Sequence, residues 1–384
     1  MAPKRYLFTP GPTPVPPQVL AALSEPVLHH RAPDFRIVYE RVLARLKEVH
    51  RTSAEVLLFT CSGTGAFESA ILNLCSPGDR VLAVSAGQFG ERWASMARGY
   101  GCEVEELSYA WGQTPSVVEL TRKLAEIERV SLVFLVHSET STGVVCDLQP
   151  LAAAAKDAGA LVVVDAVSSL GAVPLEMDEW GLDIVVSGSQ KALMTPPGLA
   201  TVAVSEAAWK LAARSTLPRY YFDWQRTRAA QAKLDSVFTP AVSLVVALDV
   251  ALGLLLEEGL DAACARHARL GRACRAGIKA MGLELFSPDE ERSAVVTAAF
   301  MPDGLGSTEL TDALRDRHGI TIAAGQGDLK ERIFRIGHIG WFDEFDIATA
   351  LSAVELVLGE LEAPIERGLA ATRALEVYAE GAPV

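Results

Sequence analysis

Short apolar runs recur between residues 56 and 204, and they constrain the fold more than any other feature of the chain. Segments with apolar residues at helical spacing, such as 148–158, separate several of them. Strands of a parallel sheet are buried on both faces, so they read as continuous apolar runs rather than as alternating patterns. The pattern therefore predicts an α/β fold in which a mostly parallel sheet carries helices on both faces. The expected strands are 56–60, 81–84, 132–136, 161–164, 184–186 and 199–204.

The pattern of helical and strand-like segments changes after about residue 255. An Ala/Arg-rich helical pattern is followed by short strand-like segments that alternate with helices, which predicts a smaller α+β domain. We expect a large α/β domain at 14–255 and a small domain at 256–384, with a long helix at 239–256 near the boundary. The elements expected in the small domain are helices at 260–281, 307–317 and 343–361 and strands at 294–300 and 332–336.

The charge and the apolar segments of the chain argue against nucleic acids and membranes as partners. The 384 residues include 35 basic and 48 acidic side chains, a net charge of −13, whereas nucleic acids and anionic membranes require an electropositive face. The longest apolar candidate, 244–256, is interrupted by Asp249 and is shorter than the roughly 20 residues of a membrane span. The N-terminus lacks the apolar core of a signal peptide, so a cytoplasmic location is expected.

Cysteine and histidine usage points away from disulfides and metals. The six cysteines include no Cys-x-x-Cys pair, which is typical of core residues in a reducing compartment. The seven histidines form no cluster with ligand spacing, so no metal site is expected.

Two polar residues follow buried strands. Asp165 ends the run 161–164, and Lys191 comes shortly after the run 184–186, within Ser-Gly-Ser-Gln-Lys. A lysine in such a position is by itself more often a surface residue. Together, the two residues form the pair that pyridoxal phosphate requires, a carboxylate for the pyridinium nitrogen and an amine for the aldehyde.

Two further segments suggest anion binding, each with a structural alternative. Ser62-Gly63-Thr64-Gly65 precedes a helical pattern at 66–72, so backbone N–H groups at the positive end of a helix are available to a phosphate. An ordinary capped turn explains the same segment, and the missing third glycine disfavours a dinucleotide. Arg335 lies in an apolar strand and needs an anionic partner, either a structural carboxylate or a substrate.

With these residues in hand, the chain resembles the class V aminotransferases, which are fold-type I pyridoxal-phosphate enzymes, and most closely the alanine/serine–glyoxylate (serine–pyruvate) branch. The resemblance runs over nearly the whole chain, and the order of its motifs is more specific than any one of them. The motifs are Pro10-Gly11-Pro12-Thr13-Pro14, Ser62-Gly63-Thr64-Gly65, Glu139-Thr140-Ser141-Thr142-Gly143, Asp165-Ala166-Val167-Ser168-Ser169, Ser189-Gln190-Lys191 and Arg335-Ile336-Gly337.

The resemblance implies a role for each matching residue. Asp165 would hold the ring nitrogen and Lys191 the aldehyde, and both would be catalytic. Phe89 would lie against the ring and Thr140 would contact its oxygen, although core packing and a turn explain these two residues as well. The phosphate would be bound by Ser62, Gly63, Thr64, Gln190 and Thr239 of the partner subunit.

Substrate binding is implied in the same way. Arg335 would hold the substrate carboxylate by a two-point contact, and Gly11 would bring the N-terminal segment 1–13 near the active site. The implied reaction transfers the amino group of alanine or serine to a 2-oxo acid, which is glyoxylate in this branch. The resemblance also implies a homodimer whose two active sites are shared between the subunits. One departure is that 235–238 lacks the Tyr that many relatives carry before the cross-subunit Thr.

Two alternatives stay open at this point. A cysteine desulfurase or other lyase uses the same cofactor, but such an enzyme needs a Cys on a mobile loop, and Cys264 and Cys274 lie in an apparent helix. A non-catalytic subunit of a larger complex is the other alternative, and the intact Lys191, Asp165 and Arg335 speak against it.

Overall fold

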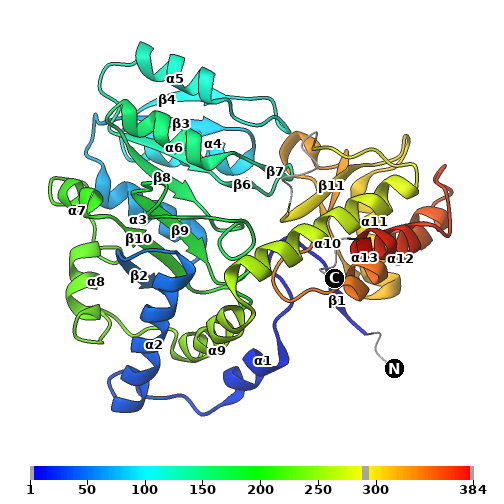
Figure 1. Cartoon of the computed structure of the whole chain (residues 1–384), viewed down its shortest axis with the longest axis horizontal. Coiled ribbons are helices and arrows are strands. Elements are labelled where there is room, and N and C mark those ends of the chain that lie inside the picture. The colour runs from blue at the N-terminus through cyan, green and yellow to red at the C-terminus, as the bar shows by residue number, and fades with distance from the viewer. Residues whose placement is uncertain (1–3, 288–293, 381–384) are drawn as a thin grey trace.

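A seven-stranded sheet forms the core of the first lobe in the computed structural model, which describes residues 4–287 and 294–380 (Figure 1). Strand β10 (Ala200–Val204) is antiparallel to both of its neighbours, and all pairs from β9 (Ile184–Gly188) to β4 (Glu103–Ser108) are parallel. The predicted α/β fold with a mostly parallel sheet is confirmed. The strand order is β2 (Glu55–Phe59), β10 (Ala200–Val204), β9 (Ile184–Gly188), β8 (Leu161–Asp165), β5 (Leu132–Val136), β3 (Arg80–Ser85) and β4 (Glu103–Ser108).

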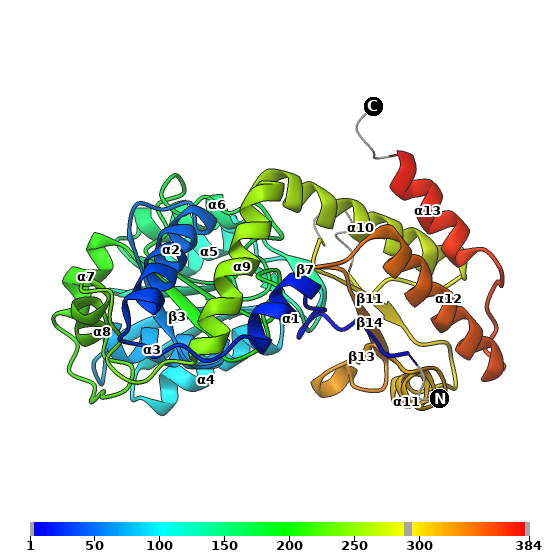
Figure 2. The same ribbon diagram turned by 90° about the horizontal axis from the view of Figure 1, so that it is seen from below.

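Helices cover both faces of this sheet, as Figure 2 shows. In β5 the side chains of Val133 and Leu135 pack into one apolar cluster, and those of Leu132 and Phe134 pack into the other. Since successive side chains of a strand point to opposite faces, a continuous apolar run is what a strand between two helical layers requires. One layer contains α2 (Pro33–Val49), α5 (Val117–Glu126), α6 (Leu148–Asp157) and α9 (Val242–Glu258), and the other contains α3 (Gly63–Leu74), α4 (Gln88–Gly99), α7 (Glu206–Ala212) and α8 (Trp224–Gln231).

Helix α9 begins at Val242, three residues later than its sequence pattern predicts. Pro240 explains the difference, because the residue before a proline is disfavoured in helical conformation. The buried Asp249 within this apolar helix is paired with Arg41 at 2.5 Å and with Arg45 at 2.7 Å, both from α2. Among the described residues, no helix has the length and apolar character needed to cross a membrane.

The second lobe has a small antiparallel sheet, in the order β11 (Val296–Phe300), β14 (Ile333–Gly337), β13 (Ala323–Ala324). Its helices fall close to the predicted ranges, except for α13 (Ala370–Glu380), which the sequence patterns did not single out. Gly259 joins α9 to α10 (Leu260–Ala280), where the chain passes from one lobe to the other (Figure 2). A domain boundary at 255/256 stays a prediction. The helices are α10 (Leu260–Ala280), α11 (Ser307–His318), α12 (Glu344–Glu360) and α13 (Ala370–Glu380).

The N-terminal segment connects the two lobes. Strand β1 (Tyr6–Leu7) pairs in parallel with β12 (Ile320–Thr321) of the second lobe. The chain then continues along the first lobe through helix α1 (Pro17–Ser24). Between these points, Thr13 donates its N–H to the Gln190 carbonyl at 3.1 Å and its hydroxyl to the Lys191 carbonyl at 3.0 Å. Residues 10–13 therefore lie against the segment that carries Lys191.

Candidate active site

A cavity of about 260 Å³ lies beyond the carboxyl ends of β8 and β9. This edge of a parallel sheet is where α/β proteins bind ligands. The cavity brings together nine residues that the sequence singled out, from six separate segments of the chain. They are Gly11, Ser62, Gly63, Thr64, Phe89, Thr140, Asp165, Gln190 and Lys191.

Lys191 is a buried amine at this cavity. Its Nζ donates a hydrogen bond to the Pro10 carbonyl at 2.9 Å. Gly11 allows this approach, since a Cβ added there would lie 2.5 Å from Nζ. Burial lowers the pKa of Lys191 to about 8, although the Asp165 carboxylate opposes the shift. An amine with such a pKa is partly neutral near physiological pH and can act as a nucleophile.

Asp165 is the last residue of β8, and its carboxylate is also buried. Its Oδ1 accepts the Val167 N–H at 3.0 Å. Burial is the main reason that its pKa rises to about 7, and the nearby Glu139 raises it further. No Lys or Arg forms an ion pair with it among residues 4–287 and 294–380. A protonated ring nitrogen is a suitable partner for such a carboxylate.

The glycine-rich segment differs from its prediction. Helix α3 starts at Gly63, not at residue 66, so Gly63, Thr64 and Gly65 form its first turn. The N–H groups of Gly63 and Thr64 are among those that a helix cannot satisfy internally. Gly63 also packs closely, because a Cβ there would lie 2.8 Å from a methyl group of Val167. The positive end of α3 therefore faces the cavity, as the phosphate interpretation requires.

The polar groups of the cavity wall match the polar groups of pyridoxal phosphate. Two buried atoms in its wall, Ser138 Oγ and Gln190 Oε1, have no hydrogen-bond partner among the described residues. Buried polar atoms are rarely left without a partner, so this pair indicates a site for a polar ligand. A carboxylate, an amine and a helix N-terminus correspond to the ring nitrogen, the aldehyde and the phosphate of that cofactor.

Glu139 holds the start of α4, the helix that carries Phe89. Its Oε2 accepts the N–H of Phe89 at 2.9 Å and that of Gly90 at 3.2 Å. Burial raises the pKa of Glu139, while these hydrogen bonds and those from Ser141 act in the opposite direction. This role was not predicted, because it depends on two segments that meet only in the folded chain.

Arg335 lies in the middle of β14 and is buried. Its guanidinium donates to the Thr140 carbonyl at 2.6 Å and twice to the Ala324 carbonyl, at 2.8 and 3.0 Å. Within the part of the chain that the structure describes, no carboxylate forms an ion pair with it. Burial lowers its pKa to about 10. A structural salt bridge of Arg335 is therefore not seen among the described residues, and the guanidinium lies beside Thr140, a residue of the cavity wall.

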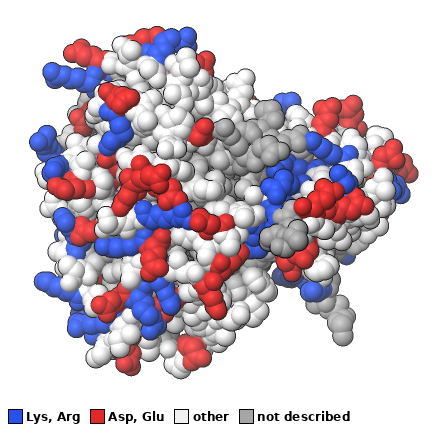
Figure 3. Space-filling view, viewed as in Figure 1, with Lys and Arg blue, Asp and Glu red and all other residues white. Residues whose placement is uncertain are grey.

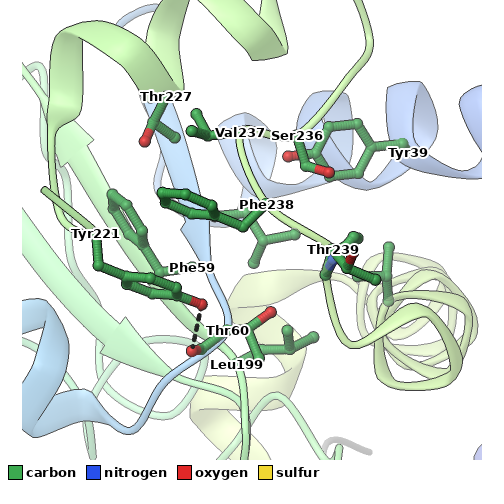
Figure 4. Close-up of a pocket in the computed structure, with 13 residues that line it drawn as sticks. Tyr39, Phe59, Thr60, Leu199, Tyr221, Thr227, Ser236, Val237, Phe238 and Thr239 are labelled. Atoms are coloured by element: carbon green, nitrogen blue, oxygen red, sulfur yellow. Dashed lines mark hydrogen bonds between the residues drawn. The ribbon is translucent and has the colours of Figure 1, made fainter. Parts of the chain in front are cut away.

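Thr239 is not part of this cavity within one chain. It lies in a second, smaller cavity of about 40 Å³, shown in Figure 4. There Phe238 stacks on Tyr221 with ring centroids 5.0 Å apart, and the Tyr221 hydroxyl donates to the Thr60 carbonyl at 3.3 Å. A contribution of Thr239 to the site of the partner subunit stays a prediction.

Arg92, Ser138 and Ser168 also line the cavity, and no role was predicted for them from the sequence. Arg92 follows Phe89 by three residues in α4, and this helical spacing is the signal that places both on one face. No cysteine lines the cavity among the described residues. Cys264 and Cys274 are buried in α10, and burial raises their pKa values to about 12 and about 11. A desulfurase nucleophile is therefore missing from this site.

Comparisons with known proteins agree with this geometry. The family model of class-V aminotransferases matches residues 5–329. A soluble hydrogenase 42 kDa subunit of Anabaena cylindrica is 42% identical over 93% of this chain and 94% of that protein. A serine–glyoxylate aminotransferase of Methylorubrum extorquens is 35% identical, with 92% of this chain and 91% of that protein covered. The crystal structure of a ureidoglycine–glyoxylate aminotransferase from Bacillus subtilis superimposes with a TM-score of 0.93 at 31% identity, covering 99% of each chain.

Proposed function

The chain belongs to the class-V aminotransferase family, and we propose that it transfers the amino group of alanine or serine to glyoxylate. It is a pyridoxal-phosphate-dependent aminotransferase with a fold-type I architecture. One observation carries the assignment of its site. Lys191, Asp165 and the N-terminus of α3 all face one cavity. Among the described residues, neither side chain has a partner of opposite charge within hydrogen-bonding distance.

The chain's own residues would hold the cofactor at several points. Asp165 would hold the ring nitrogen, Lys191 the aldehyde carbon, and Phe89 one face of the ring. The phosphate would be bound by Ser62, Gly63, Thr64 and Gln190, and Thr140 would contact the ring oxygen. When bound, pyridoxal phosphate supplies an electron sink and carries the amino group from one substrate to the other.

Lys191 is suited to move the proton at the substrate α-carbon. Its Nζ is buried at the cavity and has a pKa of about 8, so it can accept the α-proton of the donor and later return it. Pro10 and Gly11 cover the amine from the N-terminal side. This covering excludes bulk water from the proton transfer.

Arg335 is suited to bind the substrate carboxylate. A guanidinium offers two parallel N–H donors to a carboxylate, and this one donates only to backbone carbonyls among the described residues. An α-amino acid and glyoxylate both carry a carboxylate next to the reacting carbon. The same cation therefore serves both halves of the reaction.

The choice of substrates is supported by relatives, two of which are named for glyoxylate as the acceptor. Alanine and serine are proposed as donors on the family resemblance, and serine is the donor named for one of these relatives. We further propose a homodimer in which Thr239 of the partner subunit completes the phosphate site. The aromatic residues beside Thr239 are unusually exposed, with Tyr220 at 72% and Tyr221 at 41%, as an interface would require.

The 42% identity to a protein named as a hydrogenase subunit raises a second candidate, a role within a larger complex. The constellation of Lys191, Asp165 and Arg335 speaks for catalysis, because a subunit without catalysis has no need of a buried amine and a buried carboxylate at one cavity. Activity of the purified chain alone separates the two.

The test is a two-substrate assay of the purified protein with pyridoxal phosphate. Glyoxylate is the acceptor, serine, alanine and aspartate are compared as donors, and the glycine formed is measured. We expect double-reciprocal plots with parallel lines and a higher kcat/KM for serine or alanine than for aspartate. Glycine formation only from aspartate would replace the proposed donor, and no transfer from any amino acid to any 2-oxo acid would refute the function.

A further inference from the structure

Arg92 is a cation in the cavity wall to which neither the sequence nor the family motifs assign a role. It lies on α4, one helical turn after Phe89. Its Nη1 donates to the Thr64 hydroxyl at 3.2 Å, and its guanidinium carbon lies 4.8 Å from the centroid of the Phe89 ring. The side chain is half-buried, and within residues 4–287 and 294–380 no acidic side chain forms an ion pair with it. By contrast, Arg98 of the same helix is paired with Glu106.

The remaining groups at the proposed phosphate site are neutral. Ser62 and Thr64 offer hydroxyls, Gly63 offers a backbone N–H, and Gln190 offers an amide. A phosphate monoester carries about −1.5 to −2 charges at neutral pH, whereas a helix N-terminus offers only about half a positive charge. Of the described residues that line the cavity, only Arg92 and Lys191 are cations, and the proposed function engages Lys191 at the aldehyde.

The position of Arg92 matches the phosphate rather than the substrate. Its guanidinium contacts Thr64 in the first turn of α3, where the phosphate would bind, whereas the guanidinium of Arg335 contacts the Thr140 and Ala324 carbonyls. In pyridoxal phosphate the phosphate arm and the aldehyde are attached to different ring carbons, and the substrate carboxylate is carried at the aldehyde. The two arginines therefore serve different anions.

We propose that Arg92 is the cation that binds and neutralises the cofactor phosphate, through the same face of α4 that presents Phe89 to the ring. This inference rests on the proposed function, because it requires pyridoxal phosphate in this cavity. Contact with Thr64 directs the guanidinium toward the N-terminus of α3. Stacking on Phe89 limits the rotation of the side chain.

The test compares pyridoxal phosphate with pyridoxal, which has the same aldehyde and ring but no phosphate. Binding of each to cofactor-free protein is measured by tryptophan fluorescence at low and high KCl. The variants are Arg92→Gln, which removes the charge, and Arg92→Lys, which keeps it. Arg98→Gln is the matched control, since it removes the same charge from an exposed position of the same helix.

We expect Arg92→Gln to weaken pyridoxal phosphate binding about 10- to 100-fold while pyridoxal binding changes less than about threefold. Arg92→Lys should retain part of the affinity, Arg98→Gln should retain all of it, and the KCl dependence should be less steep in Arg92→Gln than in the wild type. Equal weakening of both compounds would overturn the inference, because Arg92 would then act only by supporting Phe89. Unchanged binding of pyridoxal phosphate would also overturn it. A wild-type protein that binds neither compound would refute the cofactor assignment itself.

Discussion

At the scale of single residues, the site consists of ionisable groups that the fold has removed from water. Asp165, Lys191 and Arg335 all have pKa values shifted toward the neutral form, chiefly by burial. Such shifts cost folding free energy, and they are common where a ligand of complementary charge binds. The cofactor-free protein is therefore less stable than its packing would allow.

The substitution Asp165→Asn tests whether the buried carboxylate lowers the stability of the cofactor-free protein while it is needed for turnover. The pKa of Asp165 is raised from its ordinary value of 3.8 to about 7, so the folded state loses stability as the pH rises through this range. The asparagine variant does not titrate, so its cofactor-free form should become more stable than the wild type by up to roughly 4 kcal/mol above pH 7. Its turnover should fall roughly 100- to 1000-fold, because the ring nitrogen loses its anion. Melting temperatures from pH 4 to 8 and steady-state rates check both parts, and near-normal turnover would remove Asp165 from the mechanism.

Arg335→Lys tests the carboxylate site. Lysine keeps the charge but not the planar pair of donors, so catalytic efficiency should fall by about 30- to several-thousand-fold. The loss should affect the amino donor and glyoxylate alike, while the absorbance of the bound cofactor stays normal. Arg332→Lys, at an exposed position of the adjoining segment, is the control. A loss for only one substrate would mean that the other carboxylate is bound elsewhere.

At the scale of elements, the first turn of α3 must pass close to the segment after β8. The methyl group of Val167 leaves no room for a Cβ at Gly63, the contact being 2.8 Å. We therefore expect Gly63→Ala to reduce the free energy of unfolding by about 1–3 kcal/mol through overpacking, and to weaken cofactor binding. Gly99→Ala, with nothing within 4 Å of the added carbon, should change neither. Urea unfolding and cofactor titration measure both effects, and equal behaviour of the two variants would contradict the packing argument.

The sequence predicted the elements whose residues are buried on both faces and those with strong helical periodicity. It located β5, β8 and β9 closely, because central strands of this sheet are apolar throughout. It did not single out β4, an edge strand whose sequence Glu-Val-Glu-Glu-Leu-Ser is half exposed. It placed the start of α3 three residues late, because two glycines in a first turn look like a loop.

The residues of the candidate site were also predicted only in part from the sequence. The sequence patterns and the family resemblance predicted roles for nine residues that the cavity brings together, but assigned no role to Arg92 or Glu139. Glu139 accepts a hydrogen bond from Phe89 of α4, fifty residues away in the sequence. The role proposed for Arg92 follows from its contacts with Thr64 and Phe89. The contacts of Glu139 with α4 and of Arg92 with Thr64 join segments that are far apart in the sequence, and only the helical spacing of Phe89 and Arg92 is visible as a local pattern.

At the scale of the whole molecule, one chain does not contain the complete proposed site. Thr239 lies in a different cavity from Lys191. On the face seen in Figure 3, acidic and basic side chains are interspersed, which agrees with the net charge of −13 in offering no broad basic surface to a nucleic acid. We therefore expect a second copy of the chain, rather than a polyanion, as the macromolecular partner.

Sedimentation should show a dimer, and mixing of variants tests the shared site. In a hybrid of Lys191→Ala and Thr239→Ala chains, one of the two sites has both residues intact only if Thr239 acts across the interface. Refolded mixtures should then regain activity that neither variant has alone, up to about half of the wild-type value per active hybrid. A fully active monomer, or mixtures no more active than their components, would contradict shared sites.

The central claim is that Lys191 holds pyridoxal phosphate in a two-step amino transfer, and single-turnover absorbance tests it most directly. The yellow protein should bleach when serine or alanine is added alone, and its colour should return when glyoxylate is added alone. Borohydride reduction before the donor should fix the cofactor on the peptide that contains Lys191, and Lys191→Ala should show neither the label nor the cycle. A label on another lysine, or a Lys191→Ala variant that still completes the cycle, would contradict the account.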